Sequence, residues 1–384
     1  MDRQSKALEL MLDFAGRTGL SDRDVPPRRY LWTDAFGVCN FLGLFEETGD
    51  ERLRELAVVL IDQVHHVLGR YRDDDPRTGW ISGLDEEEGE AHPTIGGLRI
   101  GKPLPERRPD EAFDEELEWN RDGQYFHYLT QWMHALERAA RVVGEPRYHR
   151  QAVELAKAAH HGFTVRTQSG TPSRMVWKMS TDLQRPLVAS MGQHDPISAY
   201  VTYSILQSNG VADPDLDLTR EIDEMATLCS SQDLRTSDSL GLGGLLSDAC
   251  RLSQLAVRGQ IEQVSWVARL LASAVPGLAR FVASPWQKQP ATYRLAFREC
   301  GLSIGLHGVE RIASLLETSP LPMDAKQDLE PLVSRLLLFR HVAREVEDFW
   351  LDPVHRANAT WEGHDAINQV MLATSLAPRG YLTV

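Results

Sequence analysis

The chain alternates two kinds of helical pattern along almost its whole length. One kind opens at a turn marked by Gly, Asp or His and continues into a helix rich in small and aromatic residues. The other kind is amphipathic, with an apolar stripe and a charged face. The first kind opens six times, at Trp32–Gly37, Trp119–Tyr125, Gln193–Ile197, Gly241–Gly244, Glu299–Leu302 and Gly363–Ile367. This repetition predicts one helical hairpin used six times.

The amphipathic segments lie between these openings. They are expected near Arg3–Phe14 and at Glu51–Arg70, Arg147–His161, Leu216–Leu228, Ile261–Val282 and Asp324–Phe349. Inner helices of a ring pack against neighbours on nearly every side, so small residues suit them, whereas outer helices need an apolar face of roughly 100°. The alternation therefore predicts an all-α fold, an (α/α)6 toroid, in which the starts of the inner helices share one cavity.

The hairpin pattern continues without a linker, so we expect a single domain over residues 1–384. The helical pattern stops between Arg72 and Glu118, an interval much longer than an ordinary connection. This 72–118 insertion contains apolar residues among Gly and Pro turns. We expect it to form an ordered lid over the cavity, anchored by Trp80, Ile81, Leu84, Ile95, Leu98, Ile100 and Leu104.

Composition and charge argue against several classes of partner. Acidic residues outnumber basic ones, 55 to 41, and no basic stripe alternates with aromatics, so we expect no nucleic-acid partner. The chain has neither a signal-peptide pattern nor a continuous run of 18 apolar residues, so we expect a cytoplasmic protein without membrane contact. Scattered cysteines indicate reduced thiols, and the lack of metal-binding spacings predicts no metal and no other cofactor. The oligomeric state stays open.

Four aspartates stand at or just before the first turn of an expected inner helix: Asp34, Asp122, Asp195 and Asp365. Aspartate is a preferred N-cap and complements the helix dipole, so capping alone can explain each of them. Carboxylates that converge on one cavity also repel one another and raise a pKa, which separates acid and base roles. We therefore predict Asp34, Asp122 and Asp195 as catalytic residues.

Aromatic and polar residues around the same openings suggest a surface for a small saccharide or glycoside. A flat ring stacks on the C–H face of a sugar, and polar groups bond its hydroxyls. The neighbouring histidines can move a proton near neutral pH. Core packing is the alternative for helix-spaced aromatics. The predicted substrate-binding residues are Trp32, Trp119, Arg121, Tyr125, His127, His194, His364 and Asp365.

Two of these segments resemble the six-hairpin glycosidase superfamily. The segment W-T-D-A-F at 32–36, followed by E-T-G-D at 47–50, is similar to the first inner helix of unsaturated uronyl hydrolases. The segment from Trp119 to Tyr125 resembles their W-x-R-G-x-x-W, with Asp122 in place of the glycine and Tyr125 in place of the second tryptophan. The resemblance implies that Asp34 or Asp122 protonates a vinyl ether and activates water.

The chain is also similar to the N-acylglucosamine 2-epimerase family, in which paired histidines exchange a proton beside the anomeric carbon. The segment Gly363–Asp365 loosely resembles a G-H-x-x-E element of that family. This resemblance implies His194 and His364 as the proton carriers. A non-catalytic helical-repeat binding protein is a third possibility. Among these alternatives we favour a glycoside hydrolase that uses carboxylates of the inner helices as general acid and base.

Overall fold

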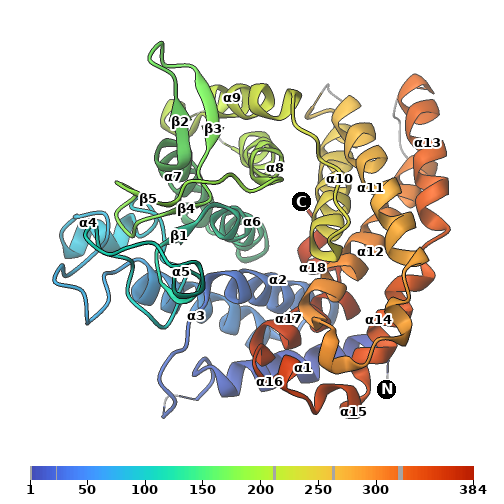
Figure 1. Cartoon of the computed structure of the whole chain (residues 1–384), viewed down its shortest axis with the longest axis horizontal. Coiled ribbons are helices and arrows are strands. Elements are labelled where there is room, and N and C mark those ends of the chain that lie inside the picture. The colour runs from blue at the N-terminus through green and yellow to red at the C-terminus, as the bar shows by residue number, and fades with distance from the viewer. Residues whose placement is uncertain (1, 23, 211–212, 262–263, 319–322) are drawn as a thin grey trace. The chain divides into compact units, whose positions relative to one another are not determined.

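The structure, a computed structural model, describes residues 2–22, 24–210, 213–261, 264–318 and 323–384 (Figure 1). Its contacts divide the chain into two compact units. The N-terminal unit covers residues 15–232, and the C-terminal unit combines residues 1–14 with residues 233–384. The helical pattern read from the sequence is present in both units. That the two units act as a single domain stays a prediction.

The N-terminal unit contains three helical hairpins. Their inner helices are α2 (Leu31–Thr48), α6 (Phe126–Val143) and α8 (Asp195–Asn209), and their outer helices are α3 (Glu51–Leu68), α7 (Pro146–Phe163) and α9 (Thr219–Ser230). Helix α6 packs against both α2 and α8. Residues 31–44 of α2 are all buried, whereas α3 buries mainly one stripe spaced three and four residues apart. Inner and outer helices therefore differ in the way that the sequence predicts.

Two glycines permit the tight turns of the first two hairpins. Gly49 ends α2 with a φ of 70°, and Gly144 ends α6 with a φ of 79°. Glycine adopts this left-handed conformation without the steric cost of a Cβ atom. Asp50 then starts α3 by accepting a hydrogen bond from the backbone N–H of Arg52. These local features place the start of each outer helix beside the end of its inner helix.

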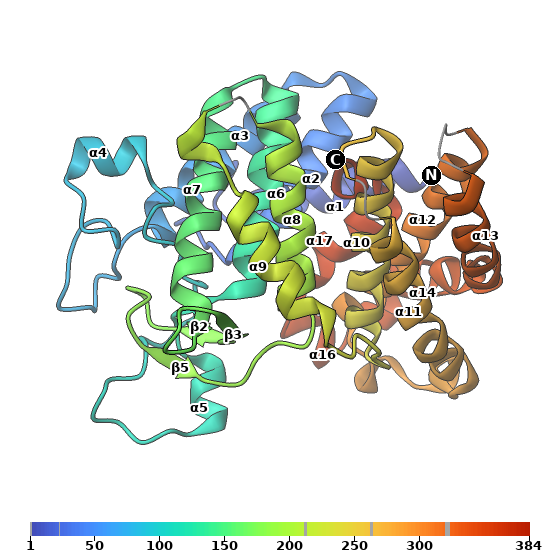
Figure 2. The same ribbon diagram turned by 90° about the horizontal axis from the view of Figure 1, so that it is seen from above.

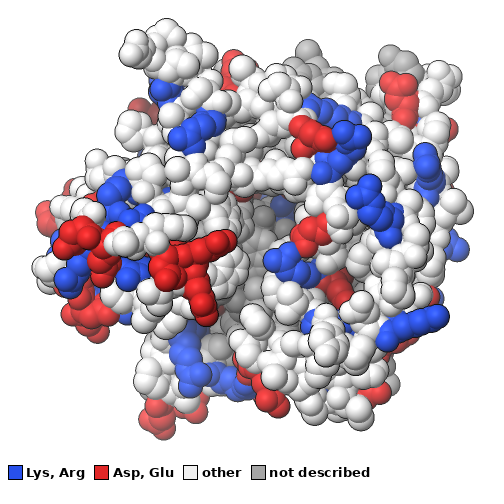
Figure 3. Space-filling view, viewed as in Figure 1, with Lys and Arg blue, Asp and Glu red and all other residues white. Residues whose placement is uncertain are grey.

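The 72–118 insertion folds against the N-terminal unit. It contains α4 (Glu86–Ala91) and leads into α5 (Glu115–Asn120). Four of the expected anchors are buried: Trp80, Ile81, Leu98 and Ile100. The expectation is wrong for Ile95 and Leu104, which are 45% and 38% exposed because they lie on the solvent side of short irregular segments. Figure 3 shows charged side chains gathered over this part of the molecule, in agreement with the acidic first turns of α4 and α5. That the insertion covers a cavity stays a prediction.

Short strands connect the helices of the N-terminal unit. Strand β4 (Lys178–Met179) pairs antiparallel with β1 (Gln124–Tyr125) and with β5 (Pro186–Val188). A separate antiparallel pair joins β2 (Thr164–Arg166) and β3 (Pro172–Met175). Strands of two to four residues are too short to show a period of two, so the sequence pattern does not predict them. Their effect is to place β4 beside the start of α6.

The C-terminal unit holds three further inner helices, α10 (Ser239–Val257), α12 (Ala296–Thr318) and α17 (Asp365–Leu376) (Figure 2). Helix α12 packs against both of the others. A Cβ atom on Gly243 of α10 would lie only 2.0 Å from the carbonyl oxygen of Gly301 in α12. Small residues therefore let these inner helices approach each other, as the sequence predicts.

The outer elements of the C-terminal unit depart from the prediction at two places. The segment 324–349, expected as one helix, forms α13 (Met323–Leu337) and α14 (His341–Leu351). The break lets α13 pack on α11 and α12 while α14 packs on α12 and α17. The helix expected from Ile261 is α11 (Ser265–Ala283), and residues 262–263 before it lie outside the described residues.

Further elements are α1 (Arg3–Arg17), α15 (Pro353–Arg356), α16 (Ala359–Glu362), α18 (Arg379–Leu382) and 3-10 turns at Pro214–Leu216, Trp286–Lys288 and Ala291–Tyr293.

Within the described part of the chain, α11 alone has the length and apolar composition of a helix that could span a membrane. It packs against α10, and its buried residues include Trp266, Leu270 and Leu278.

Candidate active site

The starts of α2 and α6 and the residue before β4 bring a set of rings together in the N-terminal unit. We call this set the aromatic cluster; its members are Tyr30, Trp32, Trp119, Tyr125, His127, Tyr128 and Trp177. The imidazole of His127 stacks on Trp177, with ring centroids 6.2 Å apart and planes inclined by 4°. The cluster includes four of the predicted substrate-binding residues: Trp32, Trp119, Tyr125 and His127.

The members of the cluster differ in exposure. Tyr125 is 2% exposed and Trp32 is 9% exposed, so both mainly support the other rings. Trp119 is 54% exposed. Partly exposed members are Tyr30, His127, Tyr128 and Trp177. The ring surface that can reach a ligand therefore comes mostly from residues other than Trp32 and Tyr125. Sequence reasoning missed Trp177 because it lies in a segment without a helical pattern.

Asp195 is the first residue of α8 and faces His127 in the first turn of α6. Its Oδ1 atom lies 4.0 Å from the Nδ1 atom of His127. The Asp195 side chain is 6% exposed, and its buried Oδ2 atom has no hydrogen-bond partner among the described residues. The Nδ1 atom of His127 is also buried without a partner, although 29% of that side chain is exposed. A carboxyl group and an imidazole thus face each other with unused hydrogen-bonding atoms.

Burial shifts the pKa of each group in the direction that keeps the pair neutral. It raises the pKa of Asp195 to about 7, against a smaller opposing effect of the Gly192 backbone N–H. It lowers the pKa of His127 to about 4. Between these values the pair is a carboxylic acid beside a neutral imidazole. The preceding loop packs closely on this carboxyl group, because a Cβ atom on Gly192 would lie 2.3 Å from Asp195 Oδ2.

Asp34 lies in the first turn of α2 and is 1% exposed. Its Oδ2 atom accepts a hydrogen bond from the Tyr30 backbone N–H at 2.9 Å, and its Oδ1 atom lies 3.5 Å from Nη1 of the buried Arg29. Burial raises the pKa of Asp34 to about 6, although Arg29 and the Tyr30 N–H both lower it. Asp34 therefore stabilises the start of α2, and its carboxyl group ionises at a lower pH than that of Asp195.

Asp122 has the contacts of a structural carboxylate. It has no exposed surface. Its Oδ2 atom accepts a hydrogen bond from Arg99 Nη1 at 2.6 Å, and its Oδ1 atom accepts from the backbone N–H groups of Gly101 and Gly123 at 3.0 and 3.1 Å. These bonds hold the insertion against β1 and the start of α6. The contacts give the expected catalytic role of Asp122 no support, because both oxygens are occupied and shielded from solvent.

Arg121 and Trp119 both contact the insertion. Arg121 forms an ion pair with Glu111. The Nζ atom of Lys102 lies 5.0 Å from the Trp119 ring centroid and 5.5 Å from that of Tyr30. Burial lowers the pKa of Lys102 to about 8, with a further contribution from the charge of Lys178. Lys102 is thus a cation at the edge of the aromatic cluster, and sequence reasoning missed it because the two segments meet only in the fold.

Lys178 on β4 is a second cation that the sequence does not single out. It is 0% exposed, and its Nζ atom donates to the Glu118 carboxylate at 2.8 Å and to the carbonyl oxygens of Glu118 and Arg121 at 2.7 and 2.8 Å. These bonds fix the end of α5 to β4. Lys178 therefore positions the segment that carries Trp119 and Arg121.

The remaining predicted residues lie outside this set of contacts. His194 is the N-cap residue of α8, without a capping hydrogen bond from its side chain. His364 and Asp365 stand at the start of α17 in the C-terminal unit, where the His364 side chain is exposed and its ring lies 5.7 Å from that of Phe297. Their functional roles stay predictions. Across the described ranges, no group of three or more His, Cys, Asp or Glu side chains is placed to hold a metal ion.

No protein-family model matches the sequence, and no curated protein matches it either. Solved structures do match. The GH76A α-1,6-mannanase from Salegentibacter sp. HEL1_6 is 12% identical, with a TM-score of 0.53 and with 98% of this chain and 99% of that chain covered. The cellobiose 2-epimerase from Spirochaeta thermophila DSM 6192 is 12% identical, with a TM-score of 0.47 and coverage of 87% and 84%. The unsaturated glucuronyl hydrolase from Bacillus sp. GL1 is 15% identical, with a TM-score of 0.38 and coverage of 97% and 96%. The likeness to the mannanase shows that this chain has an all-α (α/α)6 fold, as the sequence predicts.

Proposed function

We propose that this chain is a carbohydrate-active enzyme and, within that class, a glycoside hydrolase with Asp195 as its general acid. The observation that carries the proposal is the buried Asp195 carboxyl group, which faces His127 at 4.0 Å and has an Oδ2 atom without a hydrogen-bond partner. His127 is itself a member of the aromatic cluster. The fold shared with an α-1,6-mannanase supports a saccharide as substrate.

Asp195 has the acidity that such a role requires. Glycoside hydrolysis needs a carboxylic acid that protonates the departing glycosidic oxygen. With a pKa of about 7, the Asp195 carboxyl group still holds its proton in a mildly acidic solution. Among the described residues the buried Oδ2 atom has no hydrogen-bond partner, so its proton is available to a glycosidic oxygen once a bound glycoside displaces the groups that cover it. A positioned general acid contributes roughly 10²- to 10⁴-fold to the rate.

Asp34 is the candidate for the second carboxyl group. Arg29 favours its ionised form, and its pKa of about 6 lies below that of Asp195. Arg29 and the Tyr30 backbone N–H favour the ionised form of Asp34, whereas burial without a nearby cation favours the protonated form of Asp195. That division between base and acid is the one that paired carboxyl groups use in glycoside hydrolysis. Both oxygens of Asp34 face protein partners, so in this proposal it acts through its negative charge, which stabilises the positive charge that develops on the sugar ring.

The exposed rings of the aromatic cluster suit a neutral sugar. The ring centroids of Trp177 and Trp119 lie 6.2 Å apart. The accessible faces of these rings can stack on the C–H surface of successive sugar residues. The paired hydroxyl groups of Tyr30 and Tyr128, 2.6 Å apart, add polar atoms at the same place. One inactive variant of the mannanase has been seen in complex with α-1,6-mannotriose. We propose α-1,6-linked mannooligosaccharides as the first substrates to test.

One observation favours a sugar epimerase as the second candidate. The buried Nδ1 atom of His127 has no partner, and with a pKa of about 4 the imidazole is neutral near pH 7. A neutral imidazole can accept a proton from the carbon beside a sugar carbonyl, and return of a proton to the other face of that carbon completes the epimerisation. This reaction leaves the glycosidic bond intact and exchanges a carbon-bound proton with solvent.

One NMR experiment distinguishes these candidates. The enzyme is incubated in heavy water with α-1,6-mannotriose, with other glycosides and unsaturated uronides, and with free reducing sugars. The comparison uses the wild type, Asp195→Asn and a matched control, Asp223→Asn, which removes an exposed carboxylate on the outer helix α9. We expect the wild type and the control to release reducing ends, and Asp195→Asn to lose roughly 10²- to 10⁴-fold of that activity.

The other outcomes each overturn part of the proposal. Deuterium at C2 of a free sugar without cleavage of any glycoside would assign the epimerase reaction instead. Cleavage that persists in Asp195→Asn would remove Asp195 from the acid role. Neither cleavage nor exchange across the panel would favour a binding protein.

A further inference from the structure

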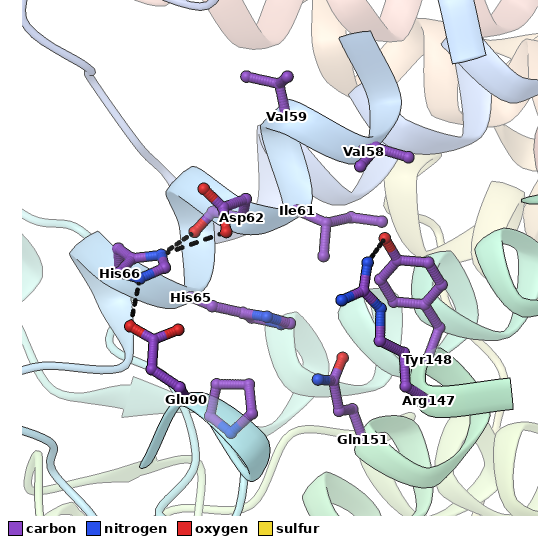
Figure 4. Close-up of a pocket in the computed structure, with 11 residues that line it drawn as sticks. Val58, Val59, Ile61, Asp62, His65, His66, Glu90, Arg147, Tyr148 and Gln151 are labelled. Carbon is purple, nitrogen blue, oxygen red and sulfur yellow. Dashed lines mark hydrogen bonds and ion pairs between the residues drawn. The ribbon is translucent and has the colours of Figure 1, made fainter. Parts of the chain in front are cut away.

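A pocket lies on the outer side of the N-terminal unit, between α3 and α7 (Figure 4). Its volume is about 320 Å³, which falls at the lower end of the range for small-molecule sites. Helix α3 contributes His65 and Val59 to its lining, α7 contributes Gln151, and the insertion contributes Pro93. None of its lining residues belongs to the aromatic cluster, so it is separate from the candidate active site.

The pocket contains an unused hydrogen-bond acceptor. Gln151 is 6% exposed, and no residue in the described part of the chain donates a hydrogen bond to its buried Oε1 atom. Its backbone carbonyl is fixed by the Thr94 hydroxyl group, which donates to it at 2.8 Å. A buried amide oxygen without a partner costs about 1–3 kcal/mol. A ligand that donates a hydrogen bond to this oxygen would recover that cost.

The same pocket contains an unused donor. His65 is 5% exposed, and its Nε2 atom accepts a hydrogen bond from the indole N–H of Trp132 at 3.2 Å. Burial lowers the pKa of His65 to about 3, so the ring is neutral and its single proton sits on Nδ1. No described residue accepts a hydrogen bond from that atom. Figure 4 shows the His65 ring and the Gln151 amide extending into the same opening.

The charged groups around the pocket are paired with one another. Arg147 forms an ion pair with Glu145 at 2.6 Å and donates to the Tyr148 hydroxyl group at 3.1 Å. His66 Nε2 lies 2.7 Å from the Glu90 carboxylate. An anion would face the carboxylates of Asp62 and Glu90, which also line the pocket. This arrangement favours a neutral ligand over a phosphate or another anion.

The wall of the pocket is partly apolar. Val58, Val59 and Ile61 of α3 line one side, and Val59 is 41% exposed. A neutral molecule that combines hydroxyl groups with C–H faces matches both parts of this lining, because hydroxyl groups both donate and accept. We propose that the pocket is a second saccharide-binding site, in which one hydroxyl group donates to Gln151 and another accepts from His65. The site is independent of turnover at Asp195 and goes beyond the proposed function.

Methyl-detected NMR tests this site directly, because Val58, Val59 and Ile61 carry reporter groups in its wall. The full chain is titrated with methyl α-D-mannopyranoside and, separately, with inorganic phosphate. We expect saturable shifts of these methyl signals with the glycoside and none with phosphate. Gln151→Leu removes the acceptor and should weaken binding about tenfold, the effect of about 1.4 kcal/mol. Arg150→Gln changes the neighbouring exposed residue, which does not line the pocket, and should bind as the wild type does.

Val59→Trp supplies an independent check, because it places a bulky ring at an exposed position of the lining and leaves Gln151 and His65 unchanged. Its expected result is loss of the saturable shifts in Val58 and Ile61, with the rest of the methyl spectrum unchanged. The proposal is overturned if the glycoside causes no saturable shift, if both pocket variants bind as tightly as the wild type, or if only phosphate binds. Since the signals report this pocket alone, these results do not depend on whether Asp195 is catalytic.

Discussion

Replacing Asp195 by asparagine should make the protein more stable at high pH and at the same time inactive. The carboxyl group has a pKa of about 7 in the folded protein and an ordinary value of 3.8, a difference of about three units. The folded state therefore binds this proton more tightly than the unfolded state does. Its contribution to the free energy of unfolding is complete below about pH 4 and is lost as the pH rises towards 7. At 1.36 kcal/mol per unit, the total loss is about 4 kcal/mol.

Asparagine does not titrate, so Asp195→Asn removes this dependence. Urea unfolding at pH 5 and at pH 8 measures it for both proteins. The stability of the variant relative to the wild type should be greater at pH 8 than at pH 5 by about 3 kcal/mol. The control Asp223→Asn changes an exposed carboxylate and should show no such difference. Glycoside cleavage by the wild type should fall about tenfold per pH unit above the pKa of the acid, as its protonated fraction falls.

Two results would refute this reasoning, and they refute different parts of it. A relative stability that is the same at both pH values would show that the Asp195 carboxyl group is not desolvated in the folded protein. A variant that gains stability at pH 8 but keeps its activity would show that the group is buried without being catalytic.

Three further substitutions test other parts of the structure. Asp122→Asn should lower the free energy of unfolding by about 3–5 kcal/mol, because it leaves the buried guanidinium of Arg99 without its counter-charge. The control Asp110→Asn changes an exposed carboxylate and should have little effect. Equal melting temperatures of the two variants would exclude the structural role of Asp122. Trp177→Ala should raise KM for an oligosaccharide about tenfold with a smaller effect on kcat, since a stacking face for the sugar is lost. An unchanged KM would show that the sugar binds elsewhere. Gly243→Ala should destabilise the C-terminal unit by about 1–3 kcal/mol in thermal unfolding, because its methyl group meets α12. The adjacent Gly244→Ala has nothing within 4 Å of its Cβ position and should stabilise the unit by up to about 1 kcal/mol. Similar effects of both substitutions would contradict the close approach of the two helices.

Local sequence determined the helices because the signals for a helix are local. The predicted openings at Trp32 and Gln193 fall beside the observed starts of α2 and α8, and each of these helices has an aspartate in its first turn. The small residues of α10 and α12 identified inner helices correctly, since only glycine permits the contact between Gly243 and Gly301. The apolar periodicity of α3 and α7 likewise reports which face each helix buries.

Tertiary structure alone decided which of the predicted site residues meet and what each carboxyl group does. Asp195 and His127 are far apart in the sequence and lie 4.0 Å apart only because α6 and α8 pack together. The sequence places Asp34, Asp122 and Asp195 alike, at the starts of helices. In the structure both oxygens of Asp122 are occupied, by an ion pair with Arg99 and by two backbone N–H groups. Among the described residues, the Oδ2 atom of Asp195 has no hydrogen-bond partner. Burial and partners set a pKa, and both come from segments distant in the chain, so no local pattern can encode them.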